Sequence, residues 1–178
     1  MNTRYMKTRA ISVVEVVIVV MVIGVLAAMA IPQYSQAAVN QTQIDLKTNL
    51  AVLRTAIEMY AQDHGAYPGQ RGIGDDTAPA GTPAAFVRQL TLCSDAEGCV
   101  GESRSDRFHF GPYLRDGVPL NPVAVGRPSA EILLIDGDAA PGFDAAAPHT
   151  GWIYNFETGY IAANSPGVDD GGARYDSY

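Results

Sequence analysis

An uncharged apolar run near the start of the chain constrains its folding more than any other feature. From Val16 to Ile31 there is no charged residue and almost no polar atom. A helix over Ile11–Ile31 would be long enough to cross about 30 Å of hydrocarbon. Most of the charge, glycine and proline follows residue 60. The chain of 178 residues is therefore expected to have two parts, an apolar N-terminal rod and one polar, turn-rich domain.

The formal net charge of −7 argues against nucleic acid as a partner, because phosphate binding requires clustered Lys and Arg. The basic cluster that is present, Arg4, Lys7 and Arg9, directly precedes the apolar run. This order is typical of an export or anchoring signal. The positive residues should stay cytoplasmic, so that the rest of the chain follows across the membrane.

Three interpretations fit this beginning. The first is a secretory signal peptide cut after Ala30, since Ala28-Met29-Ala30 is an A-x-A-like site. The second is an uncleaved membrane anchor over Ile11–Ile31. The third is a short leader, residues 1–10, that is removed on the cytoplasmic side between Ala10 and Ile11.

Glu15 favours the third interpretation. A carboxylate near the start of an apolar segment costs about 2–3 kcal/mol to insert into a membrane, and neither a signal peptide nor a simple anchor gains from it. A cut before Ile11 would create an α-amine four residues away, with an unperturbed pKa of about 8. In a bundle of such helices, Glu15 would neutralise the amine of a neighbouring copy. Misaligned packing would leave both charges unpaired, so the pair would set the register.

The segment from Arg9 to Pro32 resembles the prepilin cleavage and methylation motif of type IV pilins and type II secretion pseudopilins. It has the basic leader, the small residue before the cut, and Glu at the fifth apolar position. Gly24 and Pro32 also fall where the family has its Gly and Pro, and they are the expected places of helix flexibility. Two residues depart from the pattern: Ala10 stands where the family has Gly, and Ile11 where Phe is commonest.

The resemblance implies a structural subunit of a pilus-like filament or pseudopilus that polymerises through its N-terminal helix. A prepilin peptidase would cleave after Ala10 and methylate Ile11. The other implied partners are identical subunits, an inner-membrane platform protein and an assembly ATPase. The implied location is the inner membrane, crossed once, with the head in the periplasm or, in a true pilus, on the cell surface.

After Pro32 the helical period continues on one face. The apolar residues of this stripe are Leu46, Leu50, Leu53, Ile57 and Tyr60, and they predict a helix lying on its own domain's core. The helix should end near Asp63–His64, because Gly65 supplies a left-handed residue and Pro68 prevents continuation. The sequence 60–68 also resembles the Asp-x-Gly-x-Tyr-Pro junction of many pseudopilins.

The expected fold class is α+β: a long N-terminal helix, with a transmembrane half and an amphipathic half, packed on a small antiparallel sheet. The expected segments are a leader 1–10, an assembly helix 11–32, an amphipathic helix 33–66 and a globular head 67–178. Within the head we predict a short helix over Ala84–Leu92 and strands over Glu131–Ile135, Gly151–Phe156 and Gly159–Ala163. A hairpin turn at 157–159 should join the last two strands.

Two side-chain groups in the head are candidate sites. Cys93 and Cys99 predict a small disulfide loop if the head is exported, or two free thiols in a reducing compartment. Asp136, Asp138, Asp169 and Asp170 lie in oxygen-rich segments of the kind that bind calcium. The resemblance strengthens this, because many major pseudopilins hold calcium in a C-terminal loop, but short Asp-Gly runs are usually solvated turns.

No catalytic motif is found in the sequence. There is no G-x-S-x-G, no Ser-x-x-Lys and no phosphate loop, and the histidines, His64, His109 and His149, have no metal-ligand spacing. We therefore expect no enzymatic activity and no required cofactor, and we interpret the histidines as surface or capping residues. The alternative functions are a minor, tip-located pilin that binds a surface, DNA or a secreted substrate, and an exported enzyme using the same signal.

Overall fold

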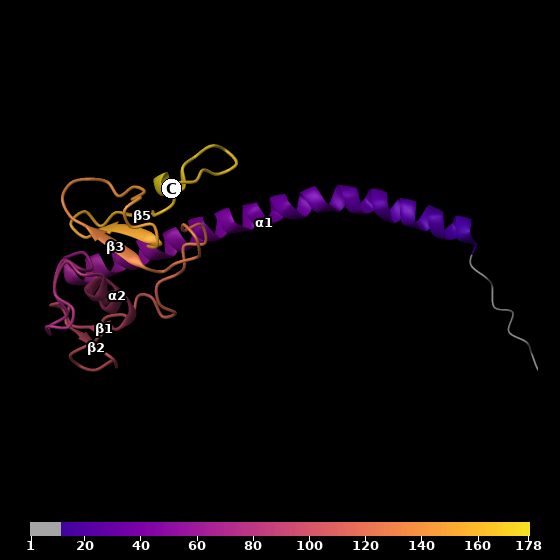
Figure 1. Cartoon of the computed structure of the whole chain (residues 1–178). Coiled ribbons are helices and arrows are strands. Elements are labelled where there is room, and N and C mark those ends of the chain that lie inside the picture. The colour runs from indigo at the N-terminus through magenta and orange to yellow at the C-terminus, as the bar shows by residue number, and fades with distance from the viewer. Residues whose placement is uncertain (1–11) are drawn as a thin grey trace, which may run out of the picture. The chain divides into compact units, whose positions relative to one another are not determined.

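The computed structural model describes residues 12–178, except for the side chains of 29–38 (Figure 1). The predicted leader, with Ala10 and Ile11 at its cut, lies outside these residues. The chain divides into two units, of which the first ends at Gln41 and the second covers Thr42–Tyr178. Helix α1 (Val13–His64) contributes to both units.

In the second unit, α1 forms one wall of the hydrophobic core. The predicted stripe is confirmed, because each of its five residues is at most 1 % exposed. These are Leu46, Leu50, Leu53, Ile57 and Tyr60. The spacing of three and four residues aligns the side chains on one face, so burying them fixes this part of α1 on the head.

The short helix α2 (Pro83–Thr91) covers the other side of this core, close to its predicted bounds. Its start is set by Pro83 and by Thr82, whose hydroxyl accepts a hydrogen bond from the Ala85 N–H. These are favoured residues at the first helical position and the N-cap. Phe86 of α2 packs on Tyr154, with ring centroids 4.4 Å apart.

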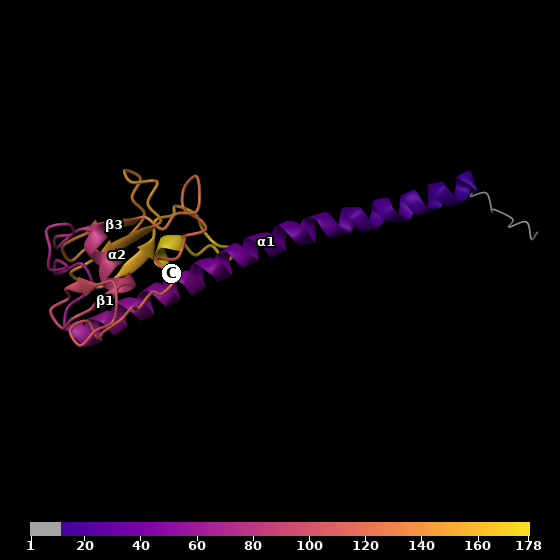
Figure 2. The ribbon, with the colours of Figure 1, turned by 90° about the horizontal axis from the view of Figure 1, so that it is seen from below.

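The described strands form a two-stranded sheet, β1 (Cys93–Ser94) with β2 (Val100–Gly101), and a three-stranded sheet in the order β3-β4-β5. The three strands are β3 (Ile132–Ile135), β4 (Trp152–Asn155) and β5 (Ile161–Ala163), within the predicted ranges. A short 3-10 helix, η1 (Tyr175–Ser177), follows. Figure 2 shows β3 and α2 on the same side of the head.

The larger sheet is mixed, so the predicted antiparallel sheet is wrong. β4 and β5 are antiparallel, as the tight turn at 157–159 requires, but β3 and β4 run parallel. A parallel pair needs a connection of about a dozen residues or more. The segment between Ile135 and Trp152 provides this length. The strand patterns in the sequence did not reveal in which direction β4 runs relative to β3.

The predicted transmembrane half of the N-terminal helix is also wrong. Within the described residues, no helix combines the length and the apolar character that crossing a membrane requires. The apolar stretch includes the carboxylate of Glu15, which opposes insertion into a membrane. The predicted single-pass inner-membrane location depended on such a helix and is corrected with it. Of the predicted fold class, the combination of helices with small sheets is present in the structure.

Candidate functional site

The most unusual surface of the described chain is the N-terminal part of α1, residues 13–28, which we call the apolar segment. Its large apolar side chains are between 45 % exposed, at Val17, and 79 % exposed, at Val13. Eight consecutive residues, from Val16 to Ile23, are exposed. Because a helix turns once in 3.6 residues, every side of this helix is both apolar and uncovered.

Glu15 lies in the first turn of α1, where a negative charge is favoured by the positive end of the helix dipole. It is exposed and lies beside Val16, Val19 and Val20. No salt bridge joins Glu15 to another described residue. Its predicted partner, the amine of Ile11 in a neighbouring copy, lies outside the described residues, so the register role stays a prediction.

Gly24 and Pro32 were the predicted positions of helix flexibility. A Cβ added at Gly24 would meet nothing within 4 Å, so this glycine is not needed for close packing inside the chain. The side chain of Pro32 lies among those not described. The helix assignment itself includes both positions.

The junction at the end of α1 is confirmed in its details. Gly65 has φ +64° and donates its N–H to the Ala61 carbonyl, 2.9 Å away, which ends the helix as predicted. His64 is buried rather than on the surface. Its Nδ1 lies 2.9 Å from the Tyr60 carbonyl oxygen and its Nε2 3.0 Å from the Ser94 Oγ. His64 therefore caps the helix and joins it to β1.

The imidazole of His64 is held between aromatic rings. It stacks on Tyr60 with centroids 3.9 Å apart and planes 9° apart, and the Phe110 ring lies 5.1 Å away. Beside this cluster, the Tyr113 hydroxyl donates to the Asp63 carboxylate at 2.7 Å. Burial and this carboxylate raise the pKa of Tyr113. The cluster is a structural anchor, which the isolated histidine in the sequence did not reveal.

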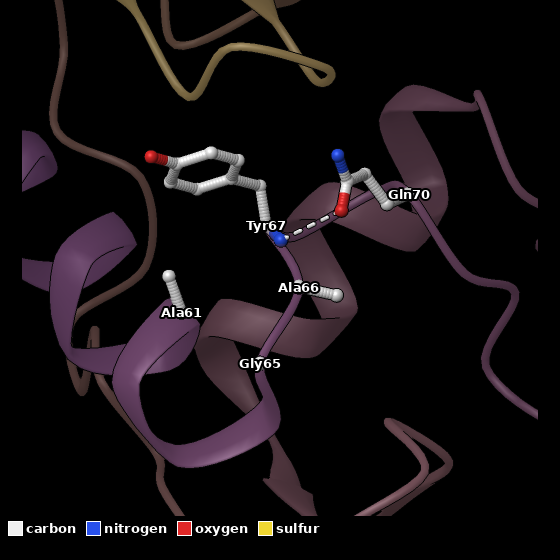
Figure 3. Close-up of a pocket in the computed structure, with 5 residues that line it drawn as sticks. All are labelled: Ala61, Gly65, Ala66, Tyr67 and Gln70. Carbon is white, nitrogen blue, oxygen red and sulfur yellow. Dashed lines mark hydrogen bonds between the residues drawn. The ribbon is translucent and has the colours of Figure 1, made fainter.

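A shallow pocket lies directly after this junction (Figure 3). Its volume is about 440 Å³, and its lining residues are Ala61, Gly65, Ala66, Tyr67 and Gln70. The Gln70 Oε1 accepts from the Tyr67 N–H at 3.0 Å, and the Gln70 Nε2 donates to the Glu157 carbonyl at 3.3 Å. Both polar atoms of the Gln70 side chain are thus hydrogen-bonded to backbone groups. The pocket presents no nucleophile and no pair of titratable groups.

The predicted disulfide is wrong, since Cys93 and Cys99 are both free. The register of β1 and β2 explains this: Cys93 lies opposite Gly101 and Ser94 opposite Val100. Continuing the ladder, the Asp95 N–H donates to the Cys99 carbonyl. The cysteines are therefore diagonal neighbours, normally about 7–8 Å apart, beyond the usual reach of a disulfide. The Cys99 sulfur lies instead against Gly74, where an added Cβ would come within 2.6 Å.

The four candidate calcium ligands differ in their surroundings. Asp136 and Asp138 are exposed after β3. Asp169 accepts hydrogen bonds from the Gly171 N–H, the Ala173 N–H and the Tyr178 hydroxyl, at 2.8, 2.8 and 2.6 Å. Among the described residues, no group of three or more His, Cys, Asp or Glu is placed to hold a metal ion. Asp169 acts as a loop anchor, and the calcium site stays a prediction.

Comparison with known proteins adds no relative. No protein-family model, curated protein or solved structure matches this chain.

Proposed function

We propose that this chain is a structural subunit of a helical filament, in which identical copies pack through the apolar segment of α1. The observation that carries this proposal is the exposure of apolar side chains on every side of 13–28. Large uncovered apolar surfaces on a protein mark places of interaction. A helix that is apolar all round is suited to the interior of a bundle.

The energy available from this burial is large. Covering one Val, Leu or Ile side chain contributes about 1.5–3 kcal/mol, and the segment offers many such side chains to each neighbour. The occupant with matching chemistry is a second copy of the same segment, because it brings an equally long apolar helix. Repeating one such contact by a fixed rotation and rise builds a filament rather than a closed ring.

Glu15 supports association between copies in a fixed register. A lone carboxylate in an apolar bundle is unfavourable unless a cation compensates it. The resemblance of Arg9–Pro32 to the prepilin motif supplies that cation, the α-amine of Ile11 after cleavage by a prepilin peptidase. By the same resemblance, an assembly ATPase and a platform protein would drive polymerisation. The head, residues 67–178, would line the outside of the filament, and its role would be structural rather than catalytic.

The test is assembly of the chain after a prepilin peptidase has cut it between Ala10 and Ile11, so that the α-amine proposed to pair with Glu15 is present. Protein dispersed in a mild non-ionic detergent is freed of detergent and examined by electron microscopy and sedimentation. We expect filaments from the wild type and none from Val19→Asp, because a carboxylate in the middle of the segment would be buried at every subunit contact. Val125→Asp is the matched control, since Val125 is exposed in the head.

Glu15→Gln separates register from association. We expect it to associate but to form short or irregular filaments, because the ordering charge pair is lost while the apolar surface remains. Wild-type chains that stay monomeric, or Val19→Asp chains that assemble as the wild type does, would contradict the proposal.

A further inference from the structure

Strand β3 is an edge strand of the three-stranded sheet, with Ile132 buried and Leu133–Ile135 half-buried, and we call its unpaired side the open edge. In the described chain it pairs with β4 on one side and has no strand on the other. The Glu131 carbonyl accepts from the Trp152 N–H, and the Ile135 carbonyl accepts from the Phe156 N–H. In a parallel ladder, alternate residues bond to the same neighbour. Ile132 and Leu134 therefore turn their backbone groups away from β4, toward the open edge.

Proteins normally protect such an edge. Common devices are a proline, a lysine, a bulge or a covering loop. The sequence of β3 is Ile-Leu-Leu-Ile, and it contains none of the protecting residues. Its length of four residues is still sufficient to pair with a short extended segment.

A groove begins at the N-terminal end of this edge. Its volume is about 500 Å³, and its walls are α2 and the start of β3. Its lining residues come from α2, from the start of β3 and from Thr150, which precedes β4. The lining residues are Pro83, Ala84, Val87, Arg88, Ala130, Glu131, Ile132 and Thr150. It is mainly apolar and has room for an aliphatic side chain of a segment paired with β3.

The charges around the edge are mainly negative. Glu131 precedes β3, and Asp136 and Asp138 follow it, all three exposed. Glu157 approaches the same end, where its carboxylate accepts from the Gly137 N–H at 2.9 Å. Arg88, a cation among the groove's lining residues, donates to the Thr77 hydroxyl at 2.7 Å.

Arg88 is partly neutralised by its surroundings. The Thr77 hydroxyl that it contacts itself donates to the Asp75 carboxylate at 2.5 Å. The edge is therefore acidic at both ends and apolar in the middle.

We propose that the open edge of β3 and the adjoining groove bind an extended segment of a partner protein, with aliphatic residues flanked by Lys or Arg. The unpaired backbone groups of Ile132 and Leu134 require an extended backbone, as in other cases of strand addition. The groove accepts an aliphatic side chain, and the acidic ends select basic flanks. This inference goes beyond filament formation and does not depend on it.

The same charges disfavour a second copy as the occupant. Antiparallel pairing of β3 with itself would bring Glu131 of one copy near Asp136 of the other. Parallel pairing would place each acidic residue near its own equivalent. Like charges facing each other across strands are destabilising, so the edge is better matched by a basic partner than by another head.

The probe for this site is the capped peptide Ac-Arg-Ile-Thr-Val-Lys-amide and a small panel with other aliphatic residues at its second and fourth positions. Binding to the full chain in non-ionic detergent is measured by fluorescence anisotropy and by amide exchange. We expect saturable binding with slowed exchange at Ile132 and Leu134. The acid-flanked peptide Ac-Glu-Ile-Thr-Val-Asp-amide and the proline-interrupted Ac-Arg-Ile-Pro-Val-Lys-amide should not bind.

The decisive variant is Glu131→Lys with Asp136→Lys, both at exposed positions. This variant should weaken binding of the basic peptide by about tenfold or more and allow the acid-flanked peptide to bind. Glu102→Lys with Asp106→Lys is the control of equal charge change, placed on the exposed loop after β2, and should leave binding intact.

Three results would overturn the assignment. The first is no binding by any peptide of the panel at about 1 mM to a folded wild type. The second is equal weakening by both charge variants, and the third is slowed exchange at the β3 edge caused by self-association alone. Filament assembly is measured separately, so failure of one proposal is distinguishable from failure of the other.

Discussion

The two parts of helix α1 with described side chains have the same backbone conformation and opposite surroundings. Over 39–64, apolar side chains recur at every third or fourth position, and those of the stripe are at most 1 % exposed. Over 13–28, nearly every side chain is apolar and all are exposed. The apolar stripe of 39–64 is covered by the rest of the same chain. The apolar side chains of 13–28 are not covered by the chain itself, and this is the basis for proposing that identical copies pack there.

The largest effect is expected from a pair of side-chain truncations, Leu50→Ala and Val22→Ala, with one in each part of the helix. Leu50 is 1 % exposed, whereas Val22 is 53 % exposed. Leu50→Ala should lower the free energy of unfolding of the head by about 2–5 kcal/mol, because it leaves a cavity. Val22→Ala should change it by less than about 0.5 kcal/mol.

Chemical denaturation in detergent, followed by circular dichroism, measures both truncations. A large loss from Val22→Ala would mean that the apolar segment is already covered within one chain. The contrast between the two parts of the helix would then fail.

A second pair compares two glycines of different backbone conformation, Gly65→Ala and Gly24→Ala. Neither added Cβ would meet an atom within 4 Å, so backbone conformation decides the outcome. Gly65 has φ +64°, and alanine there should destabilise the head by about 1 kcal/mol. Gly24 is helical, and alanine there should favour the helix by up to about 1 kcal/mol. Thermal unfolding distinguishes the opposite signs, and equal signs would contradict this account of the junction.

The smallest expected effect concerns Asp169, which holds the C-terminal segment. Hydrogen bonds from the Tyr178 hydroxyl and from backbone N–H groups lower the pKa of this carboxyl. A lowered folded-state pKa contributes stability above the unfolded value of about 3.9, and this is lost as the pH falls through the folded value. Asp169→Asn should therefore be less stable than the wild type at neutral pH, by less than the Gly65 variant.

The difference between Asp169→Asn and the wild type should shrink below about pH 4. Thermal unfolding measured against pH checks this. Asp170→Asn is the control, because the Asp170 carboxylate makes no hydrogen bond to the described residues. A difference that grows on acidification would contradict the assignment.

Several elements of the head could be predicted from local sequence. Gly65 and Pro68 indicated where α1 ends, and Pro83 indicated where α2 begins. The strand segments around Ile132, Trp152 and Ile161 were also found, because apolar residues bounded by turn residues are a local signal. Processing at Ala10 and Ile11 stays a prediction, since those residues are outside the described part of the chain.

What local sequence did not reveal depends on contacts between distant segments. The direction of β3 relative to β4 depends on the path of the connection between them. The separation of Cys93 from Cys99 follows from the register of a two-residue ladder. The burial of His64 requires Ser94 and Phe110, which are remote in sequence and packed against the helix end.

Buried asparagines illustrate the same division. Asn121, Asn155 and Asn164 are fully buried, although asparagine alone predicts an exposed turn. The Asn155 amide donates to the carbonyls of Gly137 and Ala139, at 2.7 and 3.0 Å. The Asn121 amide donates to the Gly151 carbonyl at 2.7 Å. Each amide satisfies backbone groups of a distant loop, which no local pattern encodes.

The sequence by itself determined where α1 ends, where α2 and strands β3 to β5 form, and which face of α1 is buried at residues 46–60, because periodicity and turn residues act over a few positions. The tertiary structure decided the parallel pairing of β3, the free cysteines, the buried histidine and the open acidic edge. These features depend on which distant segments meet. Their energies come from packing and hydrogen bonds that exist only after the chain has folded.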